Sequence, residues 1–510
     1  MANTIDNAYW ILDELNARKN DTQIALIHRD RKITFADLWE KSEKIAAWIL
    51  NNSKSNTPVV IYGNKDIEIV LLMIAALKSG RAYVPLDITY PVHRVEEIVN
   101  ELGAEFLFVF EDTDFGFADT RVIYSEEVNK LFEYHELVKV DPVHYVGYED
   151  NCYILFTSGS TGRPKGVQIT KKNILNFVGW FGKKCKLSQD NRVILNQVSY
   201  SFDVSVIPLY IYMPKGNTLF CIDKQMLENM SELFAFLKES SISAWISTPT
   251  LLEICMLDNS FTDKLLPDME LVVLAGEVFT KELASSIIEK FNNIKMINGY
   301  GPTEGTVLLS ACEITEDLIK KKESLPIGKI LDDGEYSIVD EQNRPVKSGE
   351  IGELVVVSDS ISKGYINNKA QTDKVFFDAG DGRKGYHTGD LVFEKGELIY
   401  YVARKDTQIK LNGFRIEMTD ISNNLNKLDN VNNSVVLPVY RNGKIAYLAG
   451  FVVLKERLED KPGKTGIALK KKLKALIPSY MVPRKIIVLD EFPMNINGKI
   501  DKKKLAEEYL

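Results

Sequence analysis

The sequence has few cysteines, no excess of basic residues and no long hydrophobic run. Its five cysteines contain no CxxC pair, so neither a disulfide framework nor a zinc knuckle is expected, and the chain is typical of a reduced, cytoplasmic protein. Lysine plus arginine number 63 against 71 aspartate plus glutamate, and the resulting net charge of -8 argues against a nucleic-acid partner. The longest apolar run, residues 69–77, is too short to cross a bilayer, and the first residues do not resemble a signal peptide, so membrane insertion is not expected.

What the sequence does contain is an ordinary globular composition, with 45% hydrophobic and 26% charged residues in a chain of 510. This length predicts about three lobes, or one large domain and a small one. Short β-branched runs alternate with helical patterns, which predicts an α/β fold with largely buried sheets. From about residue 324, short strands separated by glycines predict a β-rich subdomain, and a smaller lysine-rich segment follows. We therefore place a domain boundary near residue 405.

The strongest local motif is a loop rich in glycine, serine and threonine at residues 157–166, directly after an apolar strand predicted at residues 153–156. Such a loop offers backbone N–H groups and hydroxyls to phosphate oxygens, and Lys165 adds a positive charge. A P-loop NTPase would need G-x-x-x-x-G-K-[ST], but Lys165 lies between Pro164 and Gly166, so that spacing fails. The alternative to a phosphate-binding loop is a flexible surface turn.

Together with this loop, five further segments resemble the core motifs of the adenylate-forming (ANL) superfamily, which includes the amino-acid-activating domains of nonribosomal peptide synthetases. The six motifs occur in the family's order and cover nearly the whole chain. The five segments are residues 77–87, 298–304, 387–390, 404–417 and 497–501. The resemblance implies the ANL fold, with an N-terminal adenylation domain at residues 1–405 that binds ATP and the amino acid. A small mobile α+β domain at residues 406–510 would carry the catalytic lysine.

In adenylation, a carboxylate attacks the α-phosphorus of ATP and pyrophosphate leaves. Because this nucleophile is already ionised, no general base is required, and catalysis consists mostly of alignment and charge neutralisation. The resemblance implies ATP and Mg²⁺ as cofactors, with Glu304 as the magnesium ligand and residues 157–166 around the β- and γ-phosphates. The residues that it assigns to ATP binding are Thr157, Ser158, Gly159, Ser160, Thr161, Gly162, Lys165, Asn298, Tyr300, Thr303, Asp390 and Arg404.

The same resemblance implies individual roles for the later motifs. Thr303 would contact the α-phosphate, while Tyr300 would stack on adenine and Asn298 would hydrogen-bond it. Asp390 would take both ribose hydroxyls, helped by Arg404. Each residue also has an ordinary alternative, because a tyrosine can belong to the core, an aspartate can close a turn and an arginine can decorate the surface.

Lys499 lies in a glycine-turned loop and is implied as the catalytic residue of the first half-reaction. A cation there can bridge the substrate carboxylate, a ribose oxygen and the α-phosphate, although one of 63 basic residues could equally be a surface charge. In the family the small domain rotates after adenylation; Asp406 matches the hinge, and residues 410–414 match the loop that enters the site for the thiol step. Ala403 departs from the family, where a glycine normally precedes the arginine, and His387 receives no role.

Asp203 lies where amino-acid-activating members place an aspartate on the α-ammonium group of the substrate. That charge-assisted hydrogen bond favours an α-amino acid over a fatty or aryl acid, unless Asp203 is only a turn or N-cap residue. The family's side-chain pocket maps onto residues that are all apolar or small, so an uncharged substrate side chain is expected, although several of them could simply belong to the core. These residues are Val204, Ile207, Ile246, Val273, Ala275, Gly299, Val307 and Leu308.

The chain as a whole looks most like the D-alanine–carrier protein ligase branch, which prepares D-alanine for attachment to teichoic acids. The pocket departs from that branch, which usually has cysteine in place of Ala275 and a larger residue in place of Gly299. These two small residues predict a wider pocket, suited to proline or a branched aliphatic amino acid. D-Alanine and a larger apolar amino acid therefore both stay open as substrates.

We interpret the protein as a monomeric ligase that forms aminoacyl-AMP and then a thioester with the phosphopantetheine thiol of a separate acyl or peptidyl carrier protein. The lysine run at residues 470–474 could contact an acidic carrier, although a solvated helix face is the better interpretation. Two other functions compete with this one. Asp203 disfavours an acyl- or aryl-CoA ligase, and the intact Lys499, Glu304 and Asp390 disfavour a non-catalytic nucleotide-binding module.

Overall fold

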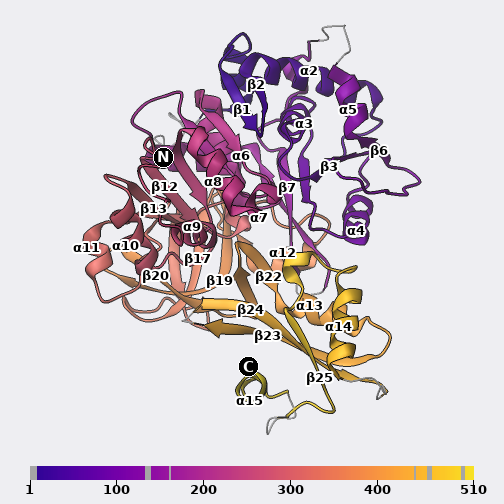
Figure 1. Ribbon diagram of the computed structural model, residues 1–510, viewed down its shortest axis with the longest axis vertical. Coiled ribbons are helices and arrows are strands. Elements are labelled where there is room, and N and C mark those ends of the chain that lie inside the picture. Colours follow the sequence, from indigo (N-terminus) through magenta and orange to yellow (C-terminus); the bar gives the residue numbers. More distant parts are fainter. Residues whose placement is uncertain (1–8, 133–138, 160–161, 442–443, 457–461, 495–499) are drawn as a thin grey trace. The chain divides into compact units, whose positions relative to one another are not determined.

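The computed structural model describes residues 9–132, 139–159, 162–441, 444–456, 462–494 and 500–510 (Figure 1). The chain divides into two compact units. The first comprises residues 1–87, 101–156 and 166–405, and the second comprises residues 88–100, 157–165 and 406–510. The predicted fold class is confirmed, because a large N-terminal part and a smaller C-terminal part both mix helices and strands. The sequence did not indicate that the two short segments group with the smaller unit.

A six-stranded sheet in the first unit has the order β6-β5-β3-β4-β7-β8, and the strands from β6 to β7 are parallel. Helix α3 is apolar on all sides and fully buried, because it packs against α2, β1, β3 and β4. The strands are β3 (Val59–Gly63), β4 (Tyr83–Asp87), β5 (Phe106–Val109), β6 (Arg121–Tyr124), β7 (Asn151–Thr157) and β8 (Lys165–Thr170). The helices are α1 (Ile11–Ala17), α2 (Phe35–Asn52), α3 (Ile67–Lys78), α5 (Ser125–Phe132) and α6 (Lys171–Lys184). Helix α4 (Val92–Leu102) falls mostly in the second unit.

A nine-stranded sheet of the same unit has the order β15-β14-β13-β12-β11-β9-β10-β1-β2 and is parallel from β13 to β1. Successive residues of its strands face opposite sides, so Ile246 and Val273 join one core while Trp245 and Val272 join another. The strands are β1 (Ile24–His28), β2 (Arg31–Thr34), β9 (Val193–Asn196), β10 (Thr218–Cys221), β11 (Ile242–Ser247), β12 (Leu271–Ala275), β13 (Lys295–Tyr300), β14 (Ser310–Glu313) and β15 (Lys329–Ile330). The helices are α7 (Lys224–Glu228), α8 (Met230–Ser240), α9 (Pro249–Met256), α10 (Lys281–Lys290) and α11 (Glu316–Lys320).

The β-rich segment expected after residue 324 is a five-stranded antiparallel sheet in which β16, β17, β19 and β18 are neighbours in that order and β20 pairs with β19. Its elements are β16 (Glu335–Val339), β17 (Gly352–Ser358), α12 (Lys369–Val375), β18 (Phe376–Asp378), β19 (Lys384–Lys395) and β20 (Leu398–Arg404). The hairpin of β19 and β20 brings Asp390 opposite Arg404, at the end of the first unit.

The second unit contains two small sheets and its own apolar core. In the three-stranded sheet, the long strands β23 and β24 pair antiparallel along their length, and β25 runs parallel to β24 (Figure 1). The elements are β21 (Gln408–Leu411), β22 (Phe414–Glu417), α13 (Met418–Asn426), β23 (Val431–Arg441), β24 (Lys444–Leu454), α14 (Pro462–Leu473), β25 (Lys485–Leu489) and α15 (Lys502–Tyr509).

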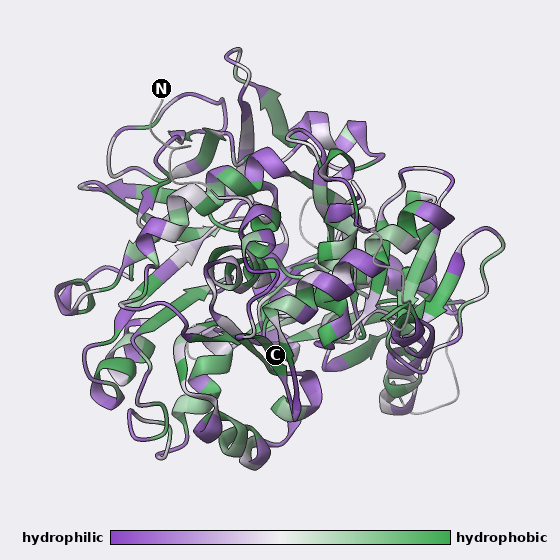
Figure 2. Ribbon diagram, turned by 90° about the horizontal axis from the view of Figure 1, so that it is seen from above, coloured by the Kyte–Doolittle hydropathy of each residue, from purple (hydrophilic) through white to green (hydrophobic). Residues whose placement is uncertain are grey.

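The distribution of hydrophobic residues differs between the strands and the helices. Figure 2 shows strands that are mostly hydrophobic and helices that alternate between hydrophobic and hydrophilic segments. Helix α2 is an example, since it buries Leu38, Ile45 and Ile49 and begins at a capping box formed by Thr34 and Asp37. Among the described residues, no helix combines the length and the apolar character that a membrane span requires.

We predict that Gly328→Ala lowers the free energy of unfolding by at least ~2 kcal/mol, because an L side chain is strained there and has no room. Gly328 has a φ of +98°, and an added Cβ would lie 2.2 Å from the carbonyl oxygen of Ala311. Gly396→Ala is the matched control, since its φ is +65° and an added Cβ would meet no atom within 4 Å. Urea titration compares the two variants, and equal losses of stability would contradict the packing argument.

Candidate active site

Three residues expected to bind the nucleoside lie together in the first unit. Tyr300 ends β13, Asp390 lies in β19 and Arg404 ends β20. The Tyr300 hydroxyl donates a hydrogen bond to Oδ2 of Asp390, and Nη1 of Arg404 lies 3.0 Å from Oδ1 of the same carboxylate. Burial and the neighbouring Asp390 hold the pKa of Tyr300 well above its usual range, so its hydroxyl keeps its proton and acts as the donor.

A second carboxylate, which the sequence analysis missed, supports the loop that carries Asp390. Oε1 of Glu353, on β17, accepts a hydrogen bond from the backbone N–H of Gly389 at 3.0 Å. Its other oxygen pairs with Nζ of Lys405 at 3.2 Å, and the ring of His387 lies 3.8 Å from Oε1. Glu353 is buried, so these partners offset the cost of burying its carboxylate. The unassigned His387 therefore lies beside the carboxylate that orients the loop.

Asn298, the predicted adenine partner, is buried on β13 two residues before Tyr300. Its side-chain amide donates to the carbonyl oxygen of Pro326 at 2.8 Å. This bond fixes the chain that leads into β15. The expected contact with adenine stays a prediction.

Glu304 and Thr303 form a short 3₁₀ turn, Thr303–Gly305, and both side chains are buried. Oε1 of Glu304 accepts a hydrogen bond from the Tyr365 hydroxyl at 2.7 Å, and the Glu304 carbonyl accepts from the backbone N–H of Ser362 at 2.8 Å. Among the described residues, no group of three or more His, Cys, Asp and Glu side chains could hold a metal ion.

The chain after Glu304 is strained. Thr306 and Val307 have φ values of 55° and 71°, and the backbone N–H of Leu308 bonds to the carbonyl oxygen of Thr306 at 2.9 Å, which closes a γ-turn at Val307. A β-branched residue rarely adopts such a φ, and strain of this kind is concentrated at functional sites. The Thr306 hydroxyl anchors the turn by donating to the Ser360 carbonyl at 2.6 Å.

The predicted amino-acid residues also lie in the first unit. Asp203 begins a 3₁₀ turn, Asp203–Ser205, and is buried. Burial raises the pKa of the Tyr153 phenol, and the nearby charge of Asp203 adds to that rise. All the predicted pocket side chains except that of Gly299, which has none, belong to one apolar cluster. Ala275 of β12 and Gly299 of β13 are register partners, so they share one face of the sheet.

The structure corrects the expectation that Gly299 widens the pocket. A Cβ placed on Gly299 would lie 2.9 Å from both methyl carbons of Leu308 and 3.4 Å from the Cβ of Ala275. The space that the glycine leaves is therefore filled by Leu308, which is itself a predicted pocket residue. Reasoning about one position at a time could not reveal which neighbour occupies that space.

The phosphate-loop residues fall mostly in the second unit. The Ser158 hydroxyl donates to the carbonyl of Arg415 and accepts from the backbone N–H of Glu417, both at 2.9 Å, so its hydrogen bonds are made with β22. Nearby, the carbonyl of Gly162 accepts from Arg94 at 3.2 Å. The other described members of the predicted set are Thr157, Gly159 and Lys165. Ser160, Thr161 and the expected catalytic Lys499 lie outside the described residues.

A buried ion pair in the second unit also lies beside this loop. Arg94 and Asp420 are 3.1 Å apart, and both are almost fully buried. Burial raises the pKa of Asp420, and the charge of Arg94 opposes that rise. The implied hinge residue, Asp406, is the first residue of the long segment of the second unit, and its Oδ1 accepts from the N–H of Gln408 at 3.0 Å.

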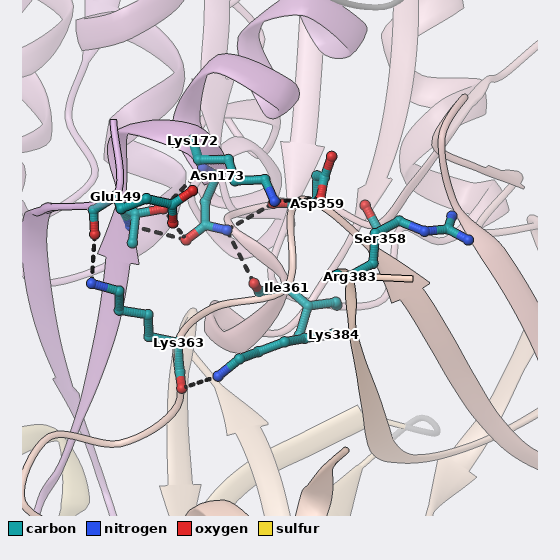
Figure 3. Close-up of a pocket in the computed structure, with 11 residues that line it drawn as sticks. Glu149, Lys172, Asn173, Ser358, Asp359, Ile361, Lys363, Arg383 and Lys384 are labelled. Atoms are coloured by element: carbon teal, nitrogen blue, oxygen red, sulfur yellow. Dashed lines mark hydrogen bonds and ion pairs between the residues drawn. The ribbon is translucent and has the colours of Figure 1, made fainter. Parts of the chain in front are cut away.

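Figure 3 shows a polar pocket elsewhere in the first unit, lined by residues of α6, β17, β19 and the chain around them. None of the predicted ATP or amino-acid residues lines it. Its cations bind protein oxygens, since Lys172 pairs with Asp359 at 2.9 Å and Lys384 donates to the carbonyl of Lys363 at 2.6 Å. Lys363 in turn donates to the carbonyl of Glu149. We assign no ligand to this pocket.

Comparison with known proteins decides the family. The profile of the AMP-binding enzyme family matches residues 13–366, and that of the AMP-binding enzyme C-terminal domain matches residues 420–499. The protein belongs to the AMP-binding enzyme family. It is an adenylate-forming ligase, and such enzymes use ATP.

Individual relatives support this assignment over nearly the whole chain. A D-alanine--D-alanyl carrier protein ligase of Bacillus licheniformis is 36% identical over 493 residues, which is 96% of this chain and 97% of the relative. A Bacillus cereus protein of the same name is 37% identical over 487 residues, covering 95% and 96%. The fold matches that of the Vibrio cholerae adenylation domain AlmE in complex with glycyl-adenosine-5'-phosphate, with a TM-score of 0.82 at 20% identity over 99% of this chain and 97% of the other.

For this AMP-binding enzyme we predict that Asp390→Asn raises the KM for ATP by roughly 10- to 100-fold, because a hydrogen bond to a charged group contributes about 1.5–3 kcal/mol. Tyr300→Phe should cause a smaller rise, since Arg404 still pairs with Asp390. Asp378→Asn, at an exposed position of β18 in the same sheet, is the control. Steady-state kinetics with varied ATP gives the comparison, and an unchanged KM in Asp390→Asn would exclude a role in binding the nucleotide.

Proposed function

We propose that this enzyme activates D-alanine with ATP and transfers it to the phosphopantetheine thiol of a separate carrier protein. The observation that carries the proposal is a buried carboxylate, Asp203, in the same unit as the apolar residues predicted to form the pocket, where Leu308 fills the space beside Gly299. The full-length similarity to proteins named D-alanine--D-alanyl carrier protein ligase supports both the substrate and the carrier.

Asp203 is suited to an α-amino acid because a carboxylate binds an ammonium group more strongly than it binds a neutral group. The α-ammonium group of the substrate would supply the positive charge through a charge-assisted hydrogen bond. A fatty or aryl acid has no such group and would leave the carboxylate facing an apolar chain. The same argument disfavours an acyl-CoA ligase.

The size of the pocket favours a small side chain. The predicted pocket side chains are apolar, and Leu308 occupies the space beside Gly299. The methyl group of alanine needs less space in such a pocket than proline or a branched aliphatic side chain. Adding atoms to a packed apolar site costs about 1–3 kcal/mol. We therefore propose D-alanine rather than the larger apolar amino acid.

We also propose Glu304 as the protein ligand of Mg²⁺. Mg²⁺ is commonly held by one or two carboxylates together with substrate phosphates, so one buried carboxylate in a polar turn fits it. When bound, the ion would neutralise charge on the leaving pyrophosphate. Tyr365 would keep the carboxylate oriented through its hydrogen bond to Oε1.

The two half-reactions would use different groups of the small domain. We propose domains at residues 1–405 and 406–510, a hinge at Asp406, Lys499 as the cation of the adenylation step, and residues 410–414 as the loop of the thiol step. A monomer in the cytoplasm is proposed as the working form. Lys470–Lys472, in the last turn of α14, offer positive charge to an acidic carrier protein.

The test is amino-acid-dependent ATP–pyrophosphate exchange across a panel of D- and L-amino acids. We expect D-alanine to lead, Lys499→Ala to lose at least ~100-fold in rate, and Asp203→Asn to raise the KM for the amino acid. Adding coenzyme A without a carrier should give no thioester. Exchange led by proline or a branched amino acid would overturn D-alanine, and a coenzyme A thioester would favour the acyl-CoA ligase.

Leu308→Ala should widen the pocket and move the preference toward larger apolar amino acids by about 10-fold or more, since it frees the space beside Gly299. Leu274→Ala is the matched control, because Leu274 is equally buried but belongs to the cluster on the other face of β12. Ratios of kcat/KM for alanine and for a branched amino acid measure the change. The same shift in both variants would show that Leu308 does not set the pocket size.

A further inference from the structure

Lys65 is a buried lysine that the reaction described above does not use. It follows β3 and is only 1% exposed, although lysine is almost never fully buried unless it is paired. Its Nζ donates to Oδ1 of Asn196 at 3.0 Å and to the carbonyl oxygen of Val198 at 2.6 Å, and it lies 3.5 Å from the centroid of the Tyr200 ring. None of these three partners is a carboxylate.

Burying this ammonium costs free energy. Burial lowers the pKa of Lys65 to about 7, while the charges of Cys221 and Asp87 act in the opposite direction. An apolar side chain of similar length would fill the same space without that cost. We therefore expect the ammonium group of Lys65 to have a function that an apolar side chain could not perform.

All three partners of Lys65 belong to one short segment. Asn196 ends β9, and its side-chain amide donates to the Tyr200 hydroxyl at 2.9 Å, so Lys65, Asn196 and Tyr200 form a closed set of contacts. A turn follows, in which the backbone N–H of Phe202 bonds to the carbonyl of Ser199 at 3.0 Å. The next residue is Asp203.

A carboxylate from the adjacent strand holds the same segment. Asp87 ends β4, and its register partner on β3 is Gly63, two residues before Lys65. The Ser199 hydroxyl donates to Oδ2 of Asp87 at 2.6 Å and lies 3.0 Å from the Ser201 hydroxyl. A cation and an anion at the carboxyl ends of neighbouring parallel strands thus hold residues 196–201 from one sheet against the other.

We propose that Lys65 is a positioning residue for amino-acid binding: its ammonium fixes residues 196–200 and thereby sets the place of Asp203. The inference rests on the proposed function, in which Asp203 binds the α-ammonium group. Lys65 touches neither substrate in this scheme and acts only through the segment that it holds. Its loss should therefore weaken amino-acid binding while leaving ATP binding intact.

The chain offers a matched control in Lys78. This lysine is 0% exposed, lies 3.3 Å from the centroid of the Trp39 ring and donates to the Trp39 carbonyl at 3.0 Å and to Glu43 at 2.8 Å. Burial lowers its pKa to about 8. Lys78 thus shares full burial and an aromatic contact with Lys65, but it also pairs with a carboxylate, and its contacts join α3 to α2 rather than to the 196–200 segment.

The experiment compares Lys65→Met and Lys78→Met in ATP–pyrophosphate exchange, with the full-length enzyme and D-alanine. We expect the KM for D-alanine to rise at least tenfold in Lys65→Met, with the KM for ATP within about twofold of wild type. Lys78→Met should leave both values within about twofold. Thermal melting checks that each variant still unfolds in a single cooperative transition.

Three results would overturn the inference. One is an unchanged KM for D-alanine in Lys65→Met, and another is an equal rise in both KM values. The third is that the wild-type enzyme catalyses exchange with no amino acid, a result that overturns both the proposed function and this inference.

If Lys65→Met does not fold, Tyr200→Phe provides a second variant. It keeps the aromatic ring beside Lys65 and removes the hydrogen bond between the Tyr200 hydroxyl and Asn196. This variant must raise the KM for D-alanine and leave the KM for ATP unchanged.

Discussion

The first unit depends on how it compensates one buried negative charge. Asp390 is accessible at only 3% and joins three strands, because Tyr300 comes from β13 and Arg404 from β20. A buried carboxylate is costly unless hydrogen bonds and a cation compensate it, so the three strands must keep their register for Tyr300 and Arg404 to reach the carboxylate. Glu353 repeats the arrangement on β17, the strand next to β19 in the same sheet, and both carboxylates pair with cations from the last residues before Asp406.

The same physical rule organises the amino-acid side of this unit. Parallel strands end together, so their carboxyl ends bring polar residues from distant parts of the sequence to one edge. Lys65 and Asp87 follow or end neighbouring strands of the six-stranded sheet, and residues 196–203 follow β9 of the nine-stranded sheet. Lys65 and Asp87 of the six-stranded sheet thus contact hydroxyl, amide and carbonyl groups of the segment that follows β9 of the nine-stranded sheet.

Part of this site could be predicted from the sequence and part could not. The family resemblance assigned Tyr300, Asp390 and Arg404 to one nucleoside site, and the structure has them in contact. The period of two along β12 and β13 explains why Ala275 and Gly299 share a face. Glu353 and Lys65 were missed, because each acts on a segment distant in sequence and lies outside the motifs that drew attention. The estimate of pocket width failed because a missing side chain makes room only if no neighbour fills it.

The turn at Thr306 and Val307 shows why residue size alone does not decide such a pocket. Two successive non-glycine residues with positive φ precede Leu308, whose side chain fills the space beside Gly299, so this backbone conformation would set the width of the proposed pocket. The same short stretch begins with Glu304, whose position Tyr365 and Ser362 hold, and Thr306 is anchored to Ser360. A change that relaxes this turn would therefore move the pocket wall and the carboxylate proposed for Mg²⁺ together. Glu304 and Leu308 are four residues apart in this stretch, so the proposed metal ligand and the proposed pocket wall are linked through the backbone rather than through a shared side chain.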